Sequence, residues 1–135
     1  MQAIWKRPSH DIPKSEALVR VTVVYVIALF IAGVILVWSS AEPLWRALWA
    51  DLAATVVVFG ASRWHRNSSF YDAFWSVIPP VLMLWWMVVG SSESTLRELL
   101  VLALLLYWAT RLTCHWAYCW PSLHHADWRY RMLRA

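Results

Sequence analysis

Charged residues are scarce in this chain of 135 amino acids, of which 15% are charged and 61% are hydrophobic. In a soluble globular domain about a quarter of the residues are charged and nearly half are apolar. Glycine occurs only three times, and no glycine begins a nucleotide-binding fingerprint or a phosphate loop. The sequence also has no nucleophile elbow and no pair of catalytic carboxylates. The common nucleotide-binding and hydrolase motifs are therefore excluded.

Cysteine is equally scarce. Cys114 and Cys119 are five positions apart on one predicted helix, which makes a disulfide between them geometrically unfavourable. Without a CxxC motif, both are best interpreted as apolar helix residues. His115, His124 and His125 raise the question of a metal or haem site, but no cysteine or carboxylate completes a convincing ligand set. We therefore predict no metal site, and the roles of His124 and His125 stay open.

The sequence has long hydrophobic runs instead. Each run is close to the ~20 residues that a helix needs to cross the hydrocarbon core of a membrane. The connections are short and polar, and no internal repeat is present. The fold class predicted is all-α, an integral membrane bundle of four transmembrane helices with short loops. Gly33 is a candidate for a close helix contact. The predicted spans are Ala17–Trp38, Leu44–Ala61, Phe70–Val89 and Leu96 to about Trp120, which divide the chain into a basic lead-in (1–16), a transmembrane domain (17–120) and an interfacial tail (121–135).

Basic residues are distributed unevenly between the two predicted sides of the membrane. One side carries nine of them and the other only two, apart from Arg111 within a span. The positive-inside rule then places both termini in the cytoplasm, in a membrane of the bacterial inner type. No basic stripe suits nucleic acid, so the partner expected is the lipid bilayer. The nine are Lys6, Arg7, Lys14, Arg20, Arg63, Arg66, Arg129, Arg131 and Arg134, and the two are Arg46 and Arg97.

The last predicted span has a polar stripe. On a helix of 3.6 residues per turn, Tyr107, Arg111, Cys114, His115 and Tyr118 share one face. Arginine stays charged, so Arg111 must reach the interface, meet a carboxylate or line a wet cavity. An ionisable side chain within a membrane span is a functional candidate for this reason.

Two carboxylates could form an ion pair with Arg111. By depth, Arg111 is better matched to Asp72, in the first turn of the third span, than to Asp51, near the opposite end of the second. We predict an Arg111–Asp72 ion pair between the third and fourth spans. Whether it serves a ligand or only packing stays open, and so does the role of Asp51.

The tail contains Asp127, Trp128, Arg129 and Tyr130 in succession. The aromatic rings can stack or lie at the membrane interface, and an arginine can bind a phosphate through two hydrogen bonds. The candidate partners are an anionic lipid headgroup and a cofactor phosphate, and composition favours the lipid.

Three segments of the sequence contain Asn67, Ser69, Asp72 and Trp75, then Arg111 and Leu112, then Asp127 to Tyr130. These segments resemble the N-terminal half of the steroid 5-alpha-reductase-like membrane proteins of unknown function. The order and spacing of the motifs match over roughly residues 60 to 134. The resemblance implies a helical integral membrane fold and a relation to NADPH-dependent reductases of lipophilic enones or sterol-like substrates.

The resemblance also implies roles for individual residues. Asp72, Arg111 and His115 are the expected catalytic residues, and Arg129 with Tyr130 is expected to touch NADPH. No residue here matches the C-terminal Asn-Tyr-x-Gly-Glu type motif of the family, so we expect half of a site, a degenerate member, or a chain that needs a complementary C-terminal half. The alternative is a non-enzymatic accessory subunit that packs against other membrane subunits. A polar cavity between the third and fourth spans favours the first interpretation, and a flat apolar face favours the second.

Overall fold

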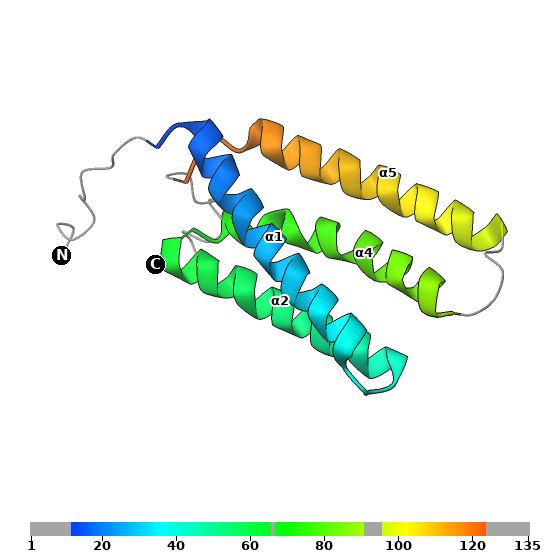
Figure 1. The fold of residues 1–135 in the computed structure, drawn as a ribbon. Helices are drawn as coiled ribbons and strands as arrows, with labels where there is room; N and C mark the ends of the chain where they lie inside the picture. The colour runs from blue at the N-terminus through cyan, green and yellow to red at the C-terminus, as the bar shows by residue number, and fades with distance from the viewer. Residues whose placement is uncertain (1–11, 66, 91–95, 124–135) are drawn as a thin grey trace, which may run out of the picture.

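The computed structural model describes residues 12–65, 67–90 and 96–123 of the chain. These residues form helices and no strand, and four helical segments are long and apolar enough to cross a membrane. The predicted all-helical membrane bundle is therefore confirmed. The helices are α1 (Lys14–Trp38), α2 (Pro43–His65), α3 (Ser69–Asp72), α4 (Phe74–Val89) and α5 (Leu96–Cys119), of which α3 and α4 together make the third crossing (Figure 1).

Helices α1 and α2 pack along a seam of small side chains. The buried residues on each helix recur at intervals of three or four positions, which keeps them on one face. Small residues at a membrane helix interface allow the two backbones to approach closely. The seam residues are Ala17, Val21, Tyr25, Ala28, Ala32 and Leu36 on α1, and Ala47, Ala50, Ala54 and Val58 on α2.

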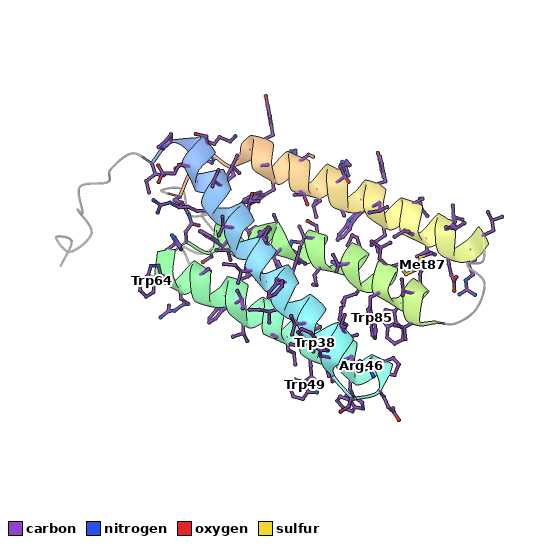
Figure 2. The ribbon with its side chains drawn as sticks, in the orientation of Figure 1. Trp38, Arg46, Trp49, Trp64, Trp85 and Met87 are labelled. Atoms are coloured by element: carbon purple, nitrogen blue, oxygen red, sulfur yellow. The ribbon has the colours of Figure 1, made fainter. Side chains whose placement is uncertain are left out.

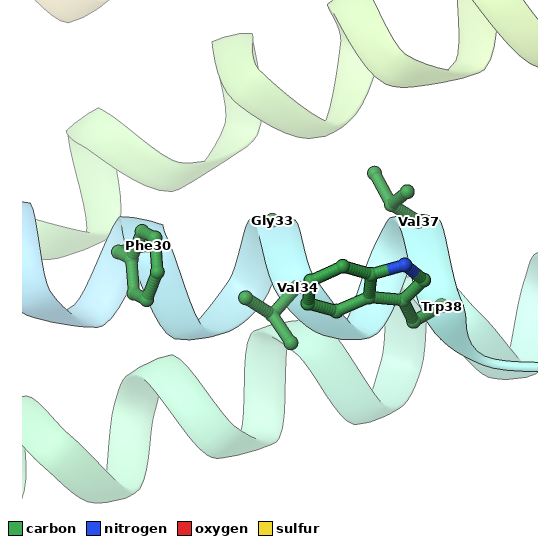
Figure 3. Close-up of a pocket in the computed structure, with 5 residues that line it drawn as sticks. All are labelled: Phe30, Gly33, Val34, Val37 and Trp38. Atoms are coloured by element: carbon green, nitrogen blue, oxygen red, sulfur yellow. The ribbon is translucent and has the colours of Figure 1, made fainter.

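Gly33 does not take part in this seam. A methyl group added at Gly33 would meet no heavy atom within 4 Å. The residue lies in a shallow apolar groove of about 310 Å³ on α1, next to Val34 and the indole of Trp38 (Figure 3). The expected close contact at Gly33 is therefore wrong, because alanines supply the small surface instead.

Helix α4 lies between the other helices. It contacts α1, α2 and α5, and α1 crosses over α2 and α4 while α5 runs along the outer edge (Figure 1). The rings of Trp75 and Trp108 meet edge to face at 5.3 Å, and the Ser76 and Thr113 hydroxyl oxygens are 2.9 Å apart. Only 6% of the apolar 18-residue stretch of α5 is buried inside the bundle, against 22–28% of the corresponding stretches in the other three crossings. Helix α5 is thus the least covered part of the bundle.

The start of α1 and the end of α5 lie at the same end of the bundle, which we call the junction end (Figure 1). The Lys14 ammonium donates a hydrogen bond of 2.8 Å to the Tyr118 carbonyl. The Ser122 hydroxyl donates one of 3.0 Å to the Ile12 carbonyl. These bonds connect the chain at the start of α1 directly with the chain at the end of α5.

Tryptophans lie at both ends of the bundle. Trp38, Trp49 and Trp85 are at the end opposite the junction, and Trp64 is at the junction end (Figure 2). Trp38 and Trp49 are exposed. Indole rings are enriched where a membrane meets water, so their positions agree with a bundle that spans a bilayer.

Candidate functional site

The turn between α2 and α3 is built around Asn67, which is 1% exposed. Its backbone N–H donates to the Ser62 carbonyl at 3.0 Å, and the Ser62 hydroxyl donates to the Asn67 carbonyl at 3.0 Å. Its side-chain oxygen accepts the Ser69 backbone N–H at 2.9 Å, and its side-chain nitrogen donates to the Leu123 carbonyl at 2.7 Å. Asn67 therefore joins three segments: the end of α2, the start of α3 and the segment after α5.

An aromatic cluster lies beside this turn. The Tyr25 hydroxyl donates to the Phe70 carbonyl at 2.5 Å, and its ring meets Phe74 edge to face at 5.5 Å. The His65 imidazole stacks on Phe70 with ring centres 4.8 Å apart. The cluster fixes α3 against α1 and the end of α2. It also fixes the position of Asp72, the last residue of α3.

The structure does not bring the three expected catalytic residues together. Asp72 is partly buried on α3, beside the aromatic cluster that contains Tyr25. Arg111 and His115, by contrast, are exposed on α5. Among the parts of the chain that the structure describes, the ion pair formed is Arg20–Glu16, with 2.6 Å between nitrogen and oxygen. The Arg111–Asp72 ion pair is therefore a wrong prediction.

The physical reason is the rotation of α5. Its buried residue is Ala109, and Thr113, one turn later on the same side of α5, lies 2.9 Å from Ser76 of α4. Arg111 lies two positions after Ala109, about 200° around the helix, and so points away from α4. The periodicity correctly grouped Arg111 with His115 and Tyr118, which is 84% exposed, but it did not show which way that face is turned.

The contact between α4 and α5 is filled by the Trp75–Trp108 and Ser76–Thr113 pairs. The polar residues expected to line a cavity there lie on the outer face of α5 instead. We call this surface the α5 polar face and define it as Tyr107, Thr110, Arg111, Cys114, His115 and Tyr118, all of which are exposed. An Arg111 on this face would meet lipid in an isolated chain, which is costly for a charged side chain.

The α5 polar face also carries nucleophilic and imidazole groups. The His115 Nε2 atom lies 3.7 Å from the Cys119 sulfur, one turn along the helix. Cys114 and Cys119 are free thiols. Within 12–65, 67–90 and 96–123, no group of three histidine, cysteine, aspartate or glutamate side chains could hold a metal ion.

The expected cofactor residues Arg129 and Tyr130 lie outside the described residues, and so do His124 and His125. Their roles stay predictions.

A second polar position is Asp51, for which the sequence predicted no role. Its carboxylate lines a groove of about 280 Å³ between α2 and the third crossing. The other lining residues are Thr55, Tyr71, Phe74, Trp75, Ile78, Pro79 and Leu82.

Comparison of the sequence with models of protein families identifies one matching family. The family DUF1295, described as a protein of unknown function, matches residues 58–135, which is more than half of the chain. The match includes the Asn67 turn, α3, α4 and α5, and it leaves out α1 and Asp51. Searches of curated proteins and of solved structures gave no significant match. The chain therefore belongs to the DUF1295 family, whose function its description leaves open.

Proposed function

We propose that this chain forms one half of a membrane reductase-type site and that the α5 polar face is one wall of that site. The family match covers every residue that carries the resemblance to steroid 5-alpha-reductase-like proteins, from Asn67 to Tyr130. The observation that carries the proposal is the exposure of Arg111 and His115 on a helix that is long and apolar enough to span a membrane. Ionisable residues inside a membrane normally face a bundle interior or a wet cavity.

The depth of these residues suits a ligand that enters from water. Arg111 lies eight residues before the end of α5 at Cys119, which is about 12 Å along the helix. His115 lies about 6 Å from the same end. In the proposal the junction end faces the cytoplasm, as the positive-inside rule predicts. NADPH is water-soluble, and it would reach this end without entering the hydrocarbon.

The chemistry of the α5 polar face fits the reduction of a lipophilic enone. NADPH, when bound, supplies a hydride. The Arg111 guanidinium is permanently positive and can stabilise negative charge that develops on the substrate oxygen. The His115 imidazole can act as the general acid that donates a proton to the substrate carbon. Arg129 would bind a cofactor phosphate and Tyr130 would contact the cofactor.

Asp72 takes a different role from these residues. It lies on α3 next to the buried Tyr25 cluster and forms no ion pair with Arg111. We assign it to positioning α3 and the Asn67 turn at the cytoplasmic edge of the site.

The other half of the site must cover the α5 polar face. A complementary C-terminal half or another membrane subunit would supply carboxylates or hydrogen-bond acceptors to Arg111 and exclude lipid. Arg111 would be stabilised by such a partner because a charge that is paired and desolvated in a cavity costs less than one facing hydrocarbon.

The second candidate function is an accessory subunit with no catalytic role. The outer half of α5 exposes Leu99, Leu100 and Leu104, and these side chains give an apolar surface for packing on a larger complex. In this case the α5 polar face would bind a partner helix and not a substrate.

The test is purification in mild detergent with native partners, followed by titration with NADPH and a radiolabelled enone reduction assay. We expect saturable NADPH binding that Arg129→Ala weakens at least tenfold. Arg111→Met should retain NADPH binding and lose at least 99% of enone reduction. The matched control is Arg97→Met, at the opposite end of α5, which should leave both unchanged. A stable larger complex that binds no NADPH would exclude the reductase and favour the accessory subunit.

A further inference from the structure

Asp51 is an intramembrane carboxylate with a cavity beside it. It lies eight residues inside α2, about 12 Å from the start of that helix at Pro43. It is partly buried, and among the described parts of the chain no hydrogen bond or ion pair is formed by its side chain. A carboxylate at this depth is costly unless it is neutralised or paired.

The groove beside Asp51 is lined by aromatic rings and hydrogen-bond acceptors. Tyr71, Phe74 and Trp75 contribute three rings, and Thr55 adds a hydroxyl one turn after Asp51. Pro79 has no backbone N–H, so the carbonyl of Trp75 receives no helical hydrogen bond from it. A negative charge together with aromatic faces is the chemistry that recognises an ammonium group.

The remaining wall of the groove is apolar. Ile78 and Leu82 continue along α4 from the aromatic rings. The lining extends over α4 from Phe74 to Leu82, which is roughly 12 Å of helix. An alkyl chain can lie along this wall while its head group stays beside Asp51.

We propose that the Asp51 groove binds a single-chain amphiphile with a protonated amine head group. The ammonium pairs with the Asp51 carboxylate and packs against the ring of Trp75, and the alkyl chain follows Ile78 and Leu82. An amine is favoured over an alcohol because a charged hydrogen bond is about twice as strong as a neutral one and because the pair cancels the buried charge.

This inference is independent of the proposed reductase. The groove is lined by α2, α3 and α4 and by no residue of the α5 polar face. Loss of NADPH binding would leave the Asp51 groove unaffected, and loss of amine binding would leave the reductase proposal unaffected.

The experiment uses the full chain in phosphatidylcholine nanodiscs and a twelve-carbon alkylamine that carries a photoreactive diazirine. Crosslinked peptides are mapped by mass spectrometry, with dodecylamine, dodecanol and dodecanoate as competitors. We expect labelling of α2 and α4 peptides, displaced by dodecylamine at concentrations at least tenfold lower than by dodecanol or dodecanoate.

Variants separate a specific site from general partitioning into lipid. Asp51→Asn removes the charge with little change of shape and should lower the labelling at least tenfold, whereas Asp51→Glu should keep it within about threefold. The control is Glu42→Gln, an exposed carboxylate just before α2, which should label as the wild type does. Helical circular dichroism confirms that each variant is folded. Equal labelling of folded Asp51→Asn, or equal competition by dodecanol, would overturn the proposal.

Discussion

The side-chain nitrogen of Asn67 donates a hydrogen bond of 2.7 Å to the carbonyl of Leu123, 56 residues further along the chain. The same side chain accepts the Ser69 backbone N–H through its oxygen. The buried side-chain amide of Asn67 therefore uses both its nitrogen and its oxygen. It holds the start of α3 to the segment that follows α5. Its loss would leave two backbone groups without their partners.

We predict that Asn67→Leu destabilises the bundle by about 1–3 kcal/mol, because unsatisfied buried polar groups cost this much. Asn67→Asp should also destabilise it, since a carboxylate cannot donate to the Leu123 carbonyl. The measurement is equilibrium unfolding in a mixed detergent. The control is Ser40→Ala, at an exposed position in the loop before α2, which should stay within about 0.5 kcal/mol of the wild type.

The hydrogen bond from Tyr25 to the Phe70 carbonyl gives the second prediction. Tyr25→Phe keeps the ring contact with Phe74 and removes only the hydroxyl, so we expect a loss of about 0.5–1.5 kcal/mol. Tyr25→Ala removes the ring as well and should cost about 3–5 kcal/mol. Tyr118→Phe serves as the control, because Tyr118 is 84% exposed. Similar stabilities for Tyr25→Phe and Tyr25→Ala would contradict the packing described.

The seam between α1 and α2 gives the third prediction. Ala32→Leu places extra methylenes at a fully buried position and should destabilise the bundle by about 1–3 kcal/mol. Gly33→Ala, at the next residue, meets no atom within 4 Å and should be neutral or stabilising by up to about 1 kcal/mol. Thermal unfolding of both variants in one detergent compares them directly. If Gly33→Ala were less stable than Ala32→Leu, the face of α1 that packs on α2 would be the one that carries Gly33 and not the one that carries Ala32.

The Ser76–Thr113 hydroxyl pair gives the fourth prediction. In a double-mutant cycle with Ser76→Ala and Thr113→Val, we expect a coupling energy of about 0.6 kcal/mol and at most about 1.7 kcal/mol, the range found for membrane helix hydrogen bonds. Ser76 also donates to the Ala73 carbonyl at 2.7 Å, so the single Ser76→Ala variant should cost more than the coupling energy. A coupling energy of zero would show that the two hydroxyl groups do not interact.

Exposure of the α5 polar face gives the fifth prediction. If the face lines a wet cavity that opens at the junction end, a membrane-impermeant maleimide added from that side should modify Cys114 in the full assembly. Cys119 lies in the last turn of α5 and should react faster, and each thiol is studied after the other is changed to serine. Modification of Cys119 with complete protection of Cys114 would indicate a dry interface and favour the accessory subunit.

Much of the fold could be predicted from the sequence, because hydrophobic length and polar loops determine where a chain crosses a membrane. The first predicted span ended at Trp38, as α1 does, and the third ended at Val89, as α4 does. The largest differences lie at the end of the second span, where α2 continues to His65 past the predicted Ala61, and at the start of the first, where α1 begins at Lys14, three residues before the predicted Ala17. Polar residues at helix ends interact with water and do not follow the apolar pattern.

The candidate site could be predicted only in part. Helical periodicity correctly placed Arg111 and His115 on one face, since this depends only on the geometry of one helix. It could not show that the face is turned away from Asp72, because that depends on which side of α5 fits the surface of α4. The packing of Trp108 against Trp75 and of Ala109 into the bundle decides this orientation, and no feature of the α5 sequence alone reveals it.

Asn67 shows the opposite case. Its sequence neighbourhood suggested a polar turn and a family motif, yet the partner of its side chain is the carbonyl of Leu123. A backbone partner leaves no signature in the sequence, because every residue type has a carbonyl. Such bonds become visible only when the whole bundle is assembled.

The bonds at the junction end have a consequence for biosynthesis. Lys14 binds the carbonyl of Tyr118, Ser122 binds that of Ile12, and Asn67 binds that of Leu123. A ribosome makes the chain from its N-terminus, so Lys14 and Asn67 enter the membrane long before their partners exist. The α1–α2 hairpin, with its own alanine seam, can form early, but the ring of contacts at this end closes only after residue 123 has left the ribosome. Synthesis of α5 and the segment after it therefore completes this ring of contacts, while the α5 polar face is left outward.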